Sequence, residues 1–186
     1  MDYLWLFQAS SNKLAISYLN QDSFAGDLFA SIGTKGLEEV KAQDKLSAAY
    51  VLLAQGTPFI NGGQEFLRTK KGDENSYASD DKINGIDLTF KQTYSDVYNT
   101  YKGLIALRKD NPAAFGANKN ASAETVSSGV TKYTTGDFCV YFNATDSAVI
   151  VAASRYSKSV DVSSGTPTEV EVVTSVPAKS FVILKK

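Results

Sequence analysis

The side chains available for chemistry in this 186-residue chain are carboxylates, hydroxyls, amides and Tyr rings. The sequence contains no His, which excludes a Ser-His-Asp or Cys-His catalytic site and any His-ligated metal ion. Its single Cys, Cys139, excludes an internal disulfide bond and a zinc site built from several Cys residues. We therefore search for function among acidic, amide and hydroxyl side chains, and we expect no cofactor and no metal site.

Charge and hydropathy exclude two classes of partner. The chain has 19 basic and 20 acidic residues and a formal net charge of −1, so it lacks the basic surface that nucleic acid requires. No apolar run reaches the roughly 18 residues that are needed to span a bilayer. We expect neither a nucleic acid nor a membrane as partner.

The longest polar stretch runs over residues 62–92 and contains Gly62, Gly63, Gly72 and Gly85. A connection of this length is uncommon inside a compact region, and it is usually either functional or disordered. Apolar residues are spread along the stretch and favour an ordered loop: Phe66, Leu67, Tyr77, Ile83, Ile86 and Leu88.

Regular elements flank this loop on both sides. The spacing of apolar residues predicts a helix over 37–55, which Gly56 and Pro58 bring to an end. The short apolar run 57–61 then predicts a buried strand. A helix followed by a tight link and a buried strand is half of an α/β repeat.

After the loop, apolar residues at helical spacing predict a second helix over 94–109. Thr93 is its expected N-cap, and Arg108 and Lys109 suit the negative C-terminal end. Asn111 and the Pro that follows it close the helix.

The composition changes near residue 112, after which short β-rich runs alternate with turn residues. No regular element is predicted for 117–129, which we expect to be mobile. Six antiparallel strands are predicted beyond it and suggest a small sandwich, with strands near 130–134, 138–143, 148–153, 159–162, 169–174 and 181–185.

Residues 54–66, with the sequence AQGTPFINGGQEF, resemble a late barrel strand of the amylase superfamily of glycoside hydrolases. The following LRTKKGDENSY at 67–77 and NGID at 84–87 are similar to type I pullulanases, which cleave α-1,6 branch bonds of pullulan and related glucans. Residues 94–98 and 101–109 resemble the last barrel helix of the same family.

The resemblance implies an α/β plus all-β architecture. The family's (β/α)8 TIM barrel typically takes ~250 residues, whereas only about 110 precede the β-rich region here. Residues 1–112 therefore resemble the C-terminal fragment of the catalytic barrel, and 113–186 an all-β C-terminal sandwich domain. No segment matches the family regions that carry the nucleophilic Asp and the acid Glu, so we expect this chain alone to be inactive.

The resemblance places one catalytic position of the family near the N-terminus. ISYLNQDS at 16–23 can be laid, with one deletion, on the family segment that contains a His-Asp pair. Asp22 then matches the third acidic residue, which stabilises the transition state, and Gln21 replaces the His. The alternative is that Asp22 is a carboxylate of a surface loop.

The resemblance also places the 62–92 loop at the active face of the barrel, because it follows the last strand. Tyr77 is suited to stack on a glucose face. The side chains expected to bind vicinal sugar hydroxyls are Arg68, Asp73, Glu74, Asn75, Ser76 and Asn84.

Each of these residues also has a structural explanation. Asp73 or Asp87 could pair with Arg68 or Lys70, and the two Asn side chains could satisfy turn backbones. Glu65, directly after Gly-Gly-Gln, is interpreted as a structural carboxylate because the family's acid lies on an earlier strand.

Aromatic and sulfur side chains elsewhere are assigned to packing. The helical spacing of Tyr94, Tyr98 and Tyr101 favours a core stripe. Cys139 is expected to be a small buried residue. Three Tyr residues of the predicted strands could stack on glucan, but packing is favoured: Tyr133, Tyr141 and Tyr156.

The sequence thus favours the C-terminal part of a pullulanase-type debranching enzyme acting on pullulan, starch or glycogen. Its expected partners are an α-glucan and the remainder of the catalytic barrel. The alternative is a non-catalytic α-glucan-binding protein or a degenerate remnant. An extracellular or cell-surface location is favoured if the parent enzyme is secreted.

Overall fold

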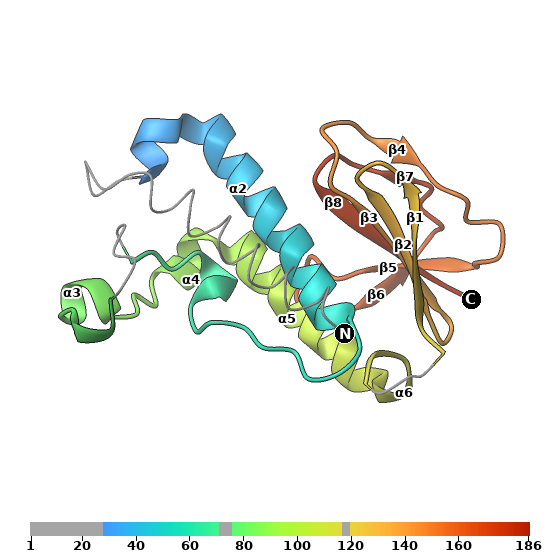
Figure 1. The fold of residues 1–186 in the computed structure, drawn as a ribbon, viewed down its shortest axis with the longest axis horizontal. Helices are drawn as coiled ribbons and strands as arrows, with labels where there is room; N and C mark the ends of the chain where they lie inside the picture. Colours follow the sequence, from blue (N-terminus) through green and yellow to red (C-terminus); the bar gives the residue numbers. More distant parts are fainter. Residues whose placement is uncertain (1–27, 71–75, 117–119) are drawn as a thin grey trace.

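Two packed helices form the centre of the molecule. The computed structural model describes residues 28–70, 76–116 and 120–186. Helix α2 (Leu28–Leu53) packs along α5 (Ser95–Asp110), and the sheet lies beside them (Figure 1). Both helices were predicted, although α2 begins nine residues before the expected start at 37. Helix α2 continues through Gly36. Because glycine weakens helices, a glycine at this position made the start of the helix hard to predict from the sequence.

The buried strand predicted at 57–61 is wrong. This segment has no regular secondary structure, and the Phe59 side chain is 71% exposed. A strand needs a neighbouring strand to pair its backbone groups, and no strand of the described residues lies against this segment.

The loop over 62–92 is ordered wherever the structure describes it. It forms a series of short helical turns: η1 (Gln64–Phe66), η2 (Ser76–Ala78), α3 (Asp81–Asn84) and, next to α5, α4 (Phe90–Thr93). Thr93 ends α4 and does not cap α5. Tyr94 takes the N-cap position of α5 without a side-chain cap.

The end of α2 is held by a residue of α5. The Arg108 guanidinium donates hydrogen bonds to the carbonyl oxygens of Leu52 (2.8 Å), Ala54 (2.6 Å) and Gly56. These acceptors lie where a helix leaves its last carbonyls without intrahelical partners. Arg108 therefore closes α2 and links it to α5, beyond which Pro112 opens the short helix α6 (Pro112–Phe115).

The C-terminal half is an antiparallel β-structure, as predicted. Its six-stranded sheet has the order β1 (Ser122–Ser127), β2 (Val130–Thr135), β3 (Phe138–Asn143), β8 (Ser180–Lys185), β5 (Lys158–Asp161) and β6 (Thr168–Val170). A second sheet pairs β4 (Val149–Ile150) with β7 (Ser175–Val176). Strands β1 and β7 were not predicted, and β1 corrects the expectation that 117–129 is mobile.

The alternation of side chains along β3 creates two cores. Phe138, Val140 and Phe142 belong to the cluster formed with α2 and α5, where the Tyr50 and Phe142 rings stack 3.7 Å apart. Cys139 and Tyr141 point to the other face, into a cluster that includes Val151 and Val176. The sheet is therefore covered by helices on one face and by the β4–β7 region on the other.

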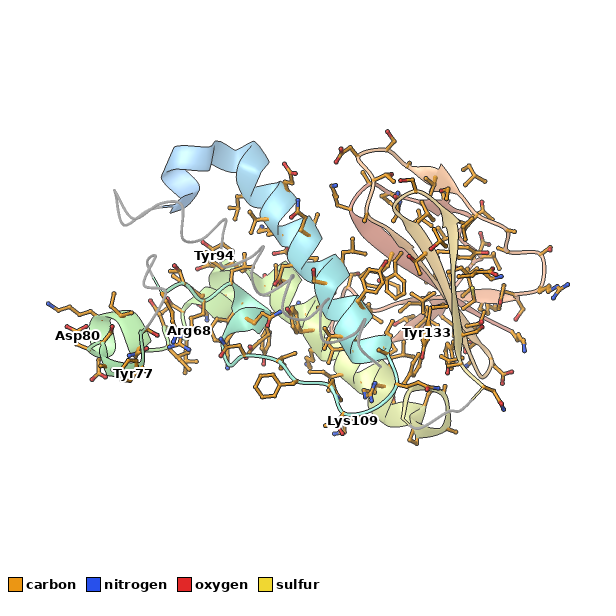
Figure 2. The ribbon with its side chains drawn as sticks, in the orientation of Figure 1. Arg68, Tyr77, Asp80, Tyr94, Lys109 and Tyr133 are labelled. Carbon is orange, nitrogen blue, oxygen red and sulfur yellow. The ribbon has the colours of Figure 1, made fainter. Side chains whose placement is uncertain are left out.

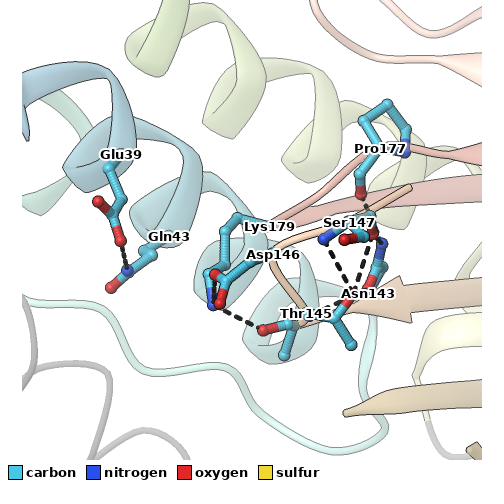
Figure 3. Close-up of polar contacts among 9 residues, drawn as sticks. Glu39, Gln43, Asn143, Thr145, Asp146, Ser147, Pro177 and Lys179 are labelled. Carbon is cyan, nitrogen blue, oxygen red and sulfur yellow. Dashed lines mark hydrogen bonds and ion pairs between the residues drawn. The ribbon is translucent and has the colours of Figure 1, made fainter. Parts of the chain in front are cut away.

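Asn143 fixes the corner where β3 ends. Its fully buried amide donates to the carbonyl oxygens of Ser147 (2.8 Å) and Pro177 (2.9 Å), which Figure 3 labels, and its oxygen accepts from the Thr145 backbone (3.0 Å). The same amide donates to the Val176 carbonyl oxygen at 3.1 Å. One side chain thus joins β3 to β7.

Among the described helices, none combines the length and apolar character that crossing a bilayer requires.

Candidate functional site

Arg68 connects the start of the 62–92 loop to Asn84. One guanidinium nitrogen donates to the Gly62 carbonyl oxygen (3.2 Å), and the other donates to the Asn84 carbonyl oxygen. Gly63 allows this approach, because a Cβ at that position would lie only 2.6 Å from Arg68 Cδ, and its φ of 96° also favours glycine. Arg68 Nε is buried and finds no acceptor among the described residues.

A second cluster joins the predicted residues Ser76 and Asn84 through Lys70. Lys70 Nζ donates to Ser76 Oγ (2.5 Å) and to Asn84 Oδ1 (3.3 Å). The Asn84 amide in turn donates to the backbone oxygens of Ser76 (2.6 Å) and Ser79 (2.8 Å). Sequence reasoning placed Lys70 only as a possible partner of an Asp, yet it is central to the cluster. These contacts show that the loop's polar side chains order the loop itself.

Tyr77 differs from Arg68, Ser76 and Asn84 because its side chain points into solvent. It is 86% exposed and lies on η2, on the same side of the molecule as Arg68 and Asp80 (Figure 2). Asp80 caps α3 by accepting the Lys82 backbone N–H at 3.0 Å. A Tyr ring that is exposed beside an ordered, hydrogen-bonded turn offers a flat apolar surface for a ligand.

Several predicted residues cannot be placed. Gln21 and Asp22 lie outside the described residues, as do Asp73, Glu74 and Asn75. The structure therefore brings together Arg68, Ser76 and Asn84 and exposes Tyr77 nearby.

The alternative partner suggested for Asp87 is not observed. Its carboxylate accepts hydrogen bonds from the Thr89 backbone N–H (2.9 Å) and from Thr89 Oγ1 (2.6 Å) rather than from Arg68 or Lys70. These hydrogen bonds lower the pKa of Asp87. Glu65 acts as the structural carboxylate expected, because its Oε2 accepts the Gly63 backbone N–H at 2.9 Å.

A buried network under the loop was missed by sequence reasoning. Tyr101 of α5 donates to Asp44 Oδ1 of α2 (3.3 Å), and Gln64 of η1 donates to the Tyr101 hydroxyl oxygen (3.0 Å). Asp44 is only 4% exposed, and its Oδ2 has no partner among the described residues. Desolvation raises the pKa of Asp44 to about 7, although the hydrogen bond from Tyr101 opposes the shift.

This network anchors the start of the loop to both helices. The sequence does contain a sign of this network. Asp44 lies four residues from both Val40 and Ala48, so the three share one helical face, and the other two are apolar and buried. A carboxylate on such a face needs a polar partner, and Tyr101 provides it.

Most of the remaining aromatic and sulfur residues pack as predicted. Tyr94 and Tyr101 are buried in the helical core, and Cys139 is buried in the sheet. Tyr98 is only half-buried and lies outside that core, with Lys91 Nζ 5.4 Å from its ring centroid. The Tyr141 hydroxyl donates to the Ala152 carbonyl oxygen at 3.0 Å. Across residues 28–70, 76–116 and 120–186, no group of three or more His, Cys, Asp and Glu side chains is arranged to hold a metal ion.

Comparison with known proteins identifies relatives that match part of the chain. No family model matches the sequence. Over 73 residues the chain is 49% identical to a pullulanase of Bacillus subtilis (strain 168), a match that covers 39% of this chain and 10% of the relative. Over 91 residues it is 31% identical to an isoamylase of Pseudomonas amyloderamosa, covering 49% of this chain and 12% of the relative.

A solved structure extends the likeness to the sheet. The pullulanase type I of Bacillus subtilis str. 168, complexed with maltose, matches 86% of this chain and 25% of its own length, with a TM-score of 0.67 and 29% identity. The chain thus spans about a tenth of the curated relatives and a quarter of this solved one. The resemblance to pullulanases is confirmed, and the partial coverage fits their C-terminal portion.

Proposed function

We propose that this pullulanase-like chain is the C-terminal part of a debranching enzyme that hydrolyses α-1,6-glucosidic bonds in pullulan, starch or glycogen. The observation that carries the proposal is the 49% identity to a pullulanase over 73 residues. The fold match over 86% of the chain supports the same assignment for the sheet. Isoamylase, a second relative, supports a debranching-enzyme-like region.

The proposed division places the end of a (β/α)8 barrel in residues 1–112 and an all-β domain in 113–186. Helices α2 and α5 then serve as the last helices of the barrel. Three apolar side chains of the segment between them are exposed and would be covered by the remainder of the barrel: Phe59, Ile86 and Leu88.

The proposed substrate contact is made by the 62–92 loop. Tyr77 stacks on a glucose ring, while Arg68, Ser76 and Asn84 hold the turn that presents it. Asp73, Glu74 and Asn75 bind sugar hydroxyls, and Gln21 and Asp22 lie at the reacting sugar, where Asp22 stabilises the transition state. The maltose in the complex of the Bacillus subtilis relative supports an α-glucan ligand.

Hydrolysis itself needs residues that the proposal places outside this chain. A retaining glycosidase uses two carboxyl groups roughly 5 Å apart, one as acid and one as nucleophile. The resemblance assigns Asp22 to a third, supporting position. The isolated chain should therefore bind glucan without cleaving it.

Affinity electrophoresis in gels that contain pullulan tests the glucan-binding part of this proposal. The chain should migrate more slowly as the pullulan content rises, and Tyr77→Ala should restore its mobility. Lys82→Ala, which removes an exposed side chain of the neighbouring α3, is the matched control and should remain retarded. Equal retardation of Tyr77→Ala and the unchanged chain would contradict the role of Tyr77, and no retardation of the unchanged chain would contradict glucan binding.

The alternative, a non-catalytic glucan-binding or degenerate protein, is favoured by the internal hydrogen bonds of Arg68, Ser76 and Asn84. A non-catalytic glucan-binding protein would also be retarded in the gel, whereas a degenerate remnant would not. Both differ from the proposed enzyme because this chain would not complete an active barrel.

A further inference from the structure

A groove of about 600 Å³ separates the helices from one end of the sheet. Its floor and walls come from α2, from one residue of α5, from the segment 159–163 and from the segment 177–183. Its volume falls within the roughly 300–1,000 Å³ range of small-molecule sites. The sheet that contributes to the groove lies at one end of the molecule, and α3 lies at the opposite end (Figure 1).

The helical side of the groove carries matched charges. Lys45 pairs with Asp96 at 2.6 Å, and Lys41 pairs with Glu38 at 3.0 Å and with Asp96 at 3.5 Å. At the opposite rim, Lys179 pairs with Asp146 at 2.9 Å. Because each of these ammonium groups already faces a carboxylate, the groove offers donors and acceptors without the excess positive charge that would attract an anion.

The sheet side of the groove carries an apolar patch beside Asp161, whose carboxylate accepts the Ser163 backbone N–H at 2.9 Å. Val170 and Val173 are 36% and 40% exposed, and the half-buried Phe181 completes the wall. The nearby hydroxyl of Ser159 is already used, because its oxygen accepts the Val173 backbone N–H at 2.8 Å. One wall therefore suits aliphatic C–H surface, while the facing wall suits hydroxyl groups.

We propose that this groove binds a neutral oligosaccharide, namely a short segment of α-glucan, at a position separate from the 62–92 loop. A sugar ring has one C–H-rich face and a rim of hydroxyls, which matches the valine wall and the side formed by Lys41 and Lys45. A wholly apolar ligand would remove water from these charges without replacing their hydrogen bonds. The choice of glucan, among neutral polyols, rests on the function proposed above.

Amide chemical-shift mapping of the full chain with maltotriose tests the site. Maltotriose should shift the amides of Lys45, Val173 and Phe181 in a saturable manner. Citrate, used as an anionic probe at the same concentrations, should leave these amides unmoved. A groove that responds to citrate and not to maltotriose would overturn the assignment of a neutral ligand.

Two neighbouring substitutions on α2 supply a matched pair. Ala42 lines the groove, so an indole in Ala42→Trp should fill it and abolish the groove shifts. Gln43 does not line the groove, so Gln43→Trp should keep them. If Ala42→Trp fails to give the dispersed spectrum of a folded chain, Val173→Ser removes part of the apolar wall at an exposed position and should weaken the maltotriose response.

The outcomes separate this inference from the proposed function. Shifts confined to the loop amides of Tyr77 and Asn84 would overturn the groove site and leave glucan binding by the loop intact. Groove shifts that persist in a folded Ala42→Trp variant would also overturn it. A complete lack of shifts would overturn both.

Discussion

Tyr101 donates a hydrogen bond to Asp44 at 3.3 Å across the interface of α2 and α5, in the interior of the helical core. The same hydroxyl accepts a hydrogen bond from Gln64, the first residue of η1. A single phenol thus connects both helices to the start of the 62–92 loop. The carboxylate that it contacts is desolvated, which makes this junction sensitive to pH.

Asp44 should make the chain less stable as pH rises from about 4 to about 7. Its folded-state pKa of about 7 lies above the ordinary value of 3.8, so within this window the folded chain retains a proton that the unfolded chain releases. The loss of unfolding free energy is on the order of 4 kcal/mol. Asp44→Asn should remove this decline, as measured by urea unfolding at pH 5 and pH 8.

Asp110→Asn is the matched control, because Asp110 is exposed at the end of α5. It should retain the stability difference between pH 5 and pH 8. An unchanged difference in the Asp44→Asn variant would show that Asp44 is not the group responsible.

Gly103→Ala should destabilise the chain, although this substitution normally favours a helix by about 1 kcal/mol. A Cβ at position 103 would lie 2.2 Å from the Val162 carbonyl oxygen, so α5 would have to move away from the segment that follows β5. We expect a cost of roughly 1–3 kcal/mol, typical of overpacking, in chemical denaturation.

Gly62→Ala is the control for Gly103→Ala, since a Cβ at position 62 meets nothing within 4 Å. It should leave the stability nearly unchanged or slightly higher. Equal or greater stability of Gly103→Ala would contradict the close packing of α5 on the strand region.

Arg108→Lys should destabilise α2 even though the charge is kept. A lysine cannot reproduce the fork that donates to the carbonyl oxygens of Leu52, Ala54 and Gly56. The expected cost is about 1–3 kcal/mol in urea unfolding. Lys109→Met changes the neighbouring exposed cation and should alter stability by less than about 0.5 kcal/mol. Similar effects of both variants would contradict the specific role of the fork.

The elements that could be predicted from the sequence are those marked by a regular spacing or a continuous run of apolar residues. Strand β3 was predicted with the observed bounds, because its run of apolar residues follows a Gly136-Asp137 turn. Strand β1 was missed, because all six of its side chains are exposed and it is held by backbone pairing to β2. Phe59 was expected to be buried, but burial depends on which strand lies beside it, and that neighbour cannot be inferred from a short apolar run.

The candidate site was predictable in outline only. The composition of 62–92 predicted an ordered functional loop; the order is observed in the described part of the loop, and its binding role stays a prediction. Which polar side chains order the loop depends on distances between Lys70, Ser76 and Asn84, and no spacing rule gives these distances for an irregular segment. The Asp44–Tyr101 contact joins residues 57 positions apart, so only the packing of α2 on α5 reveals it.

The proposal that this chain forms part of a debranching enzyme is tested most directly by pullulan hydrolysis in a chimera. The segment of the Bacillus subtilis pullulanase that matches this chain would be replaced by this chain, and the release of reducing sugar from pullulan measured. The account predicts an active chimera, strong loss of activity on Asp22→Asn, and no release by this chain alone. A chimera that unfolds cooperatively, as the parent does, but releases no reducing sugar would contradict it.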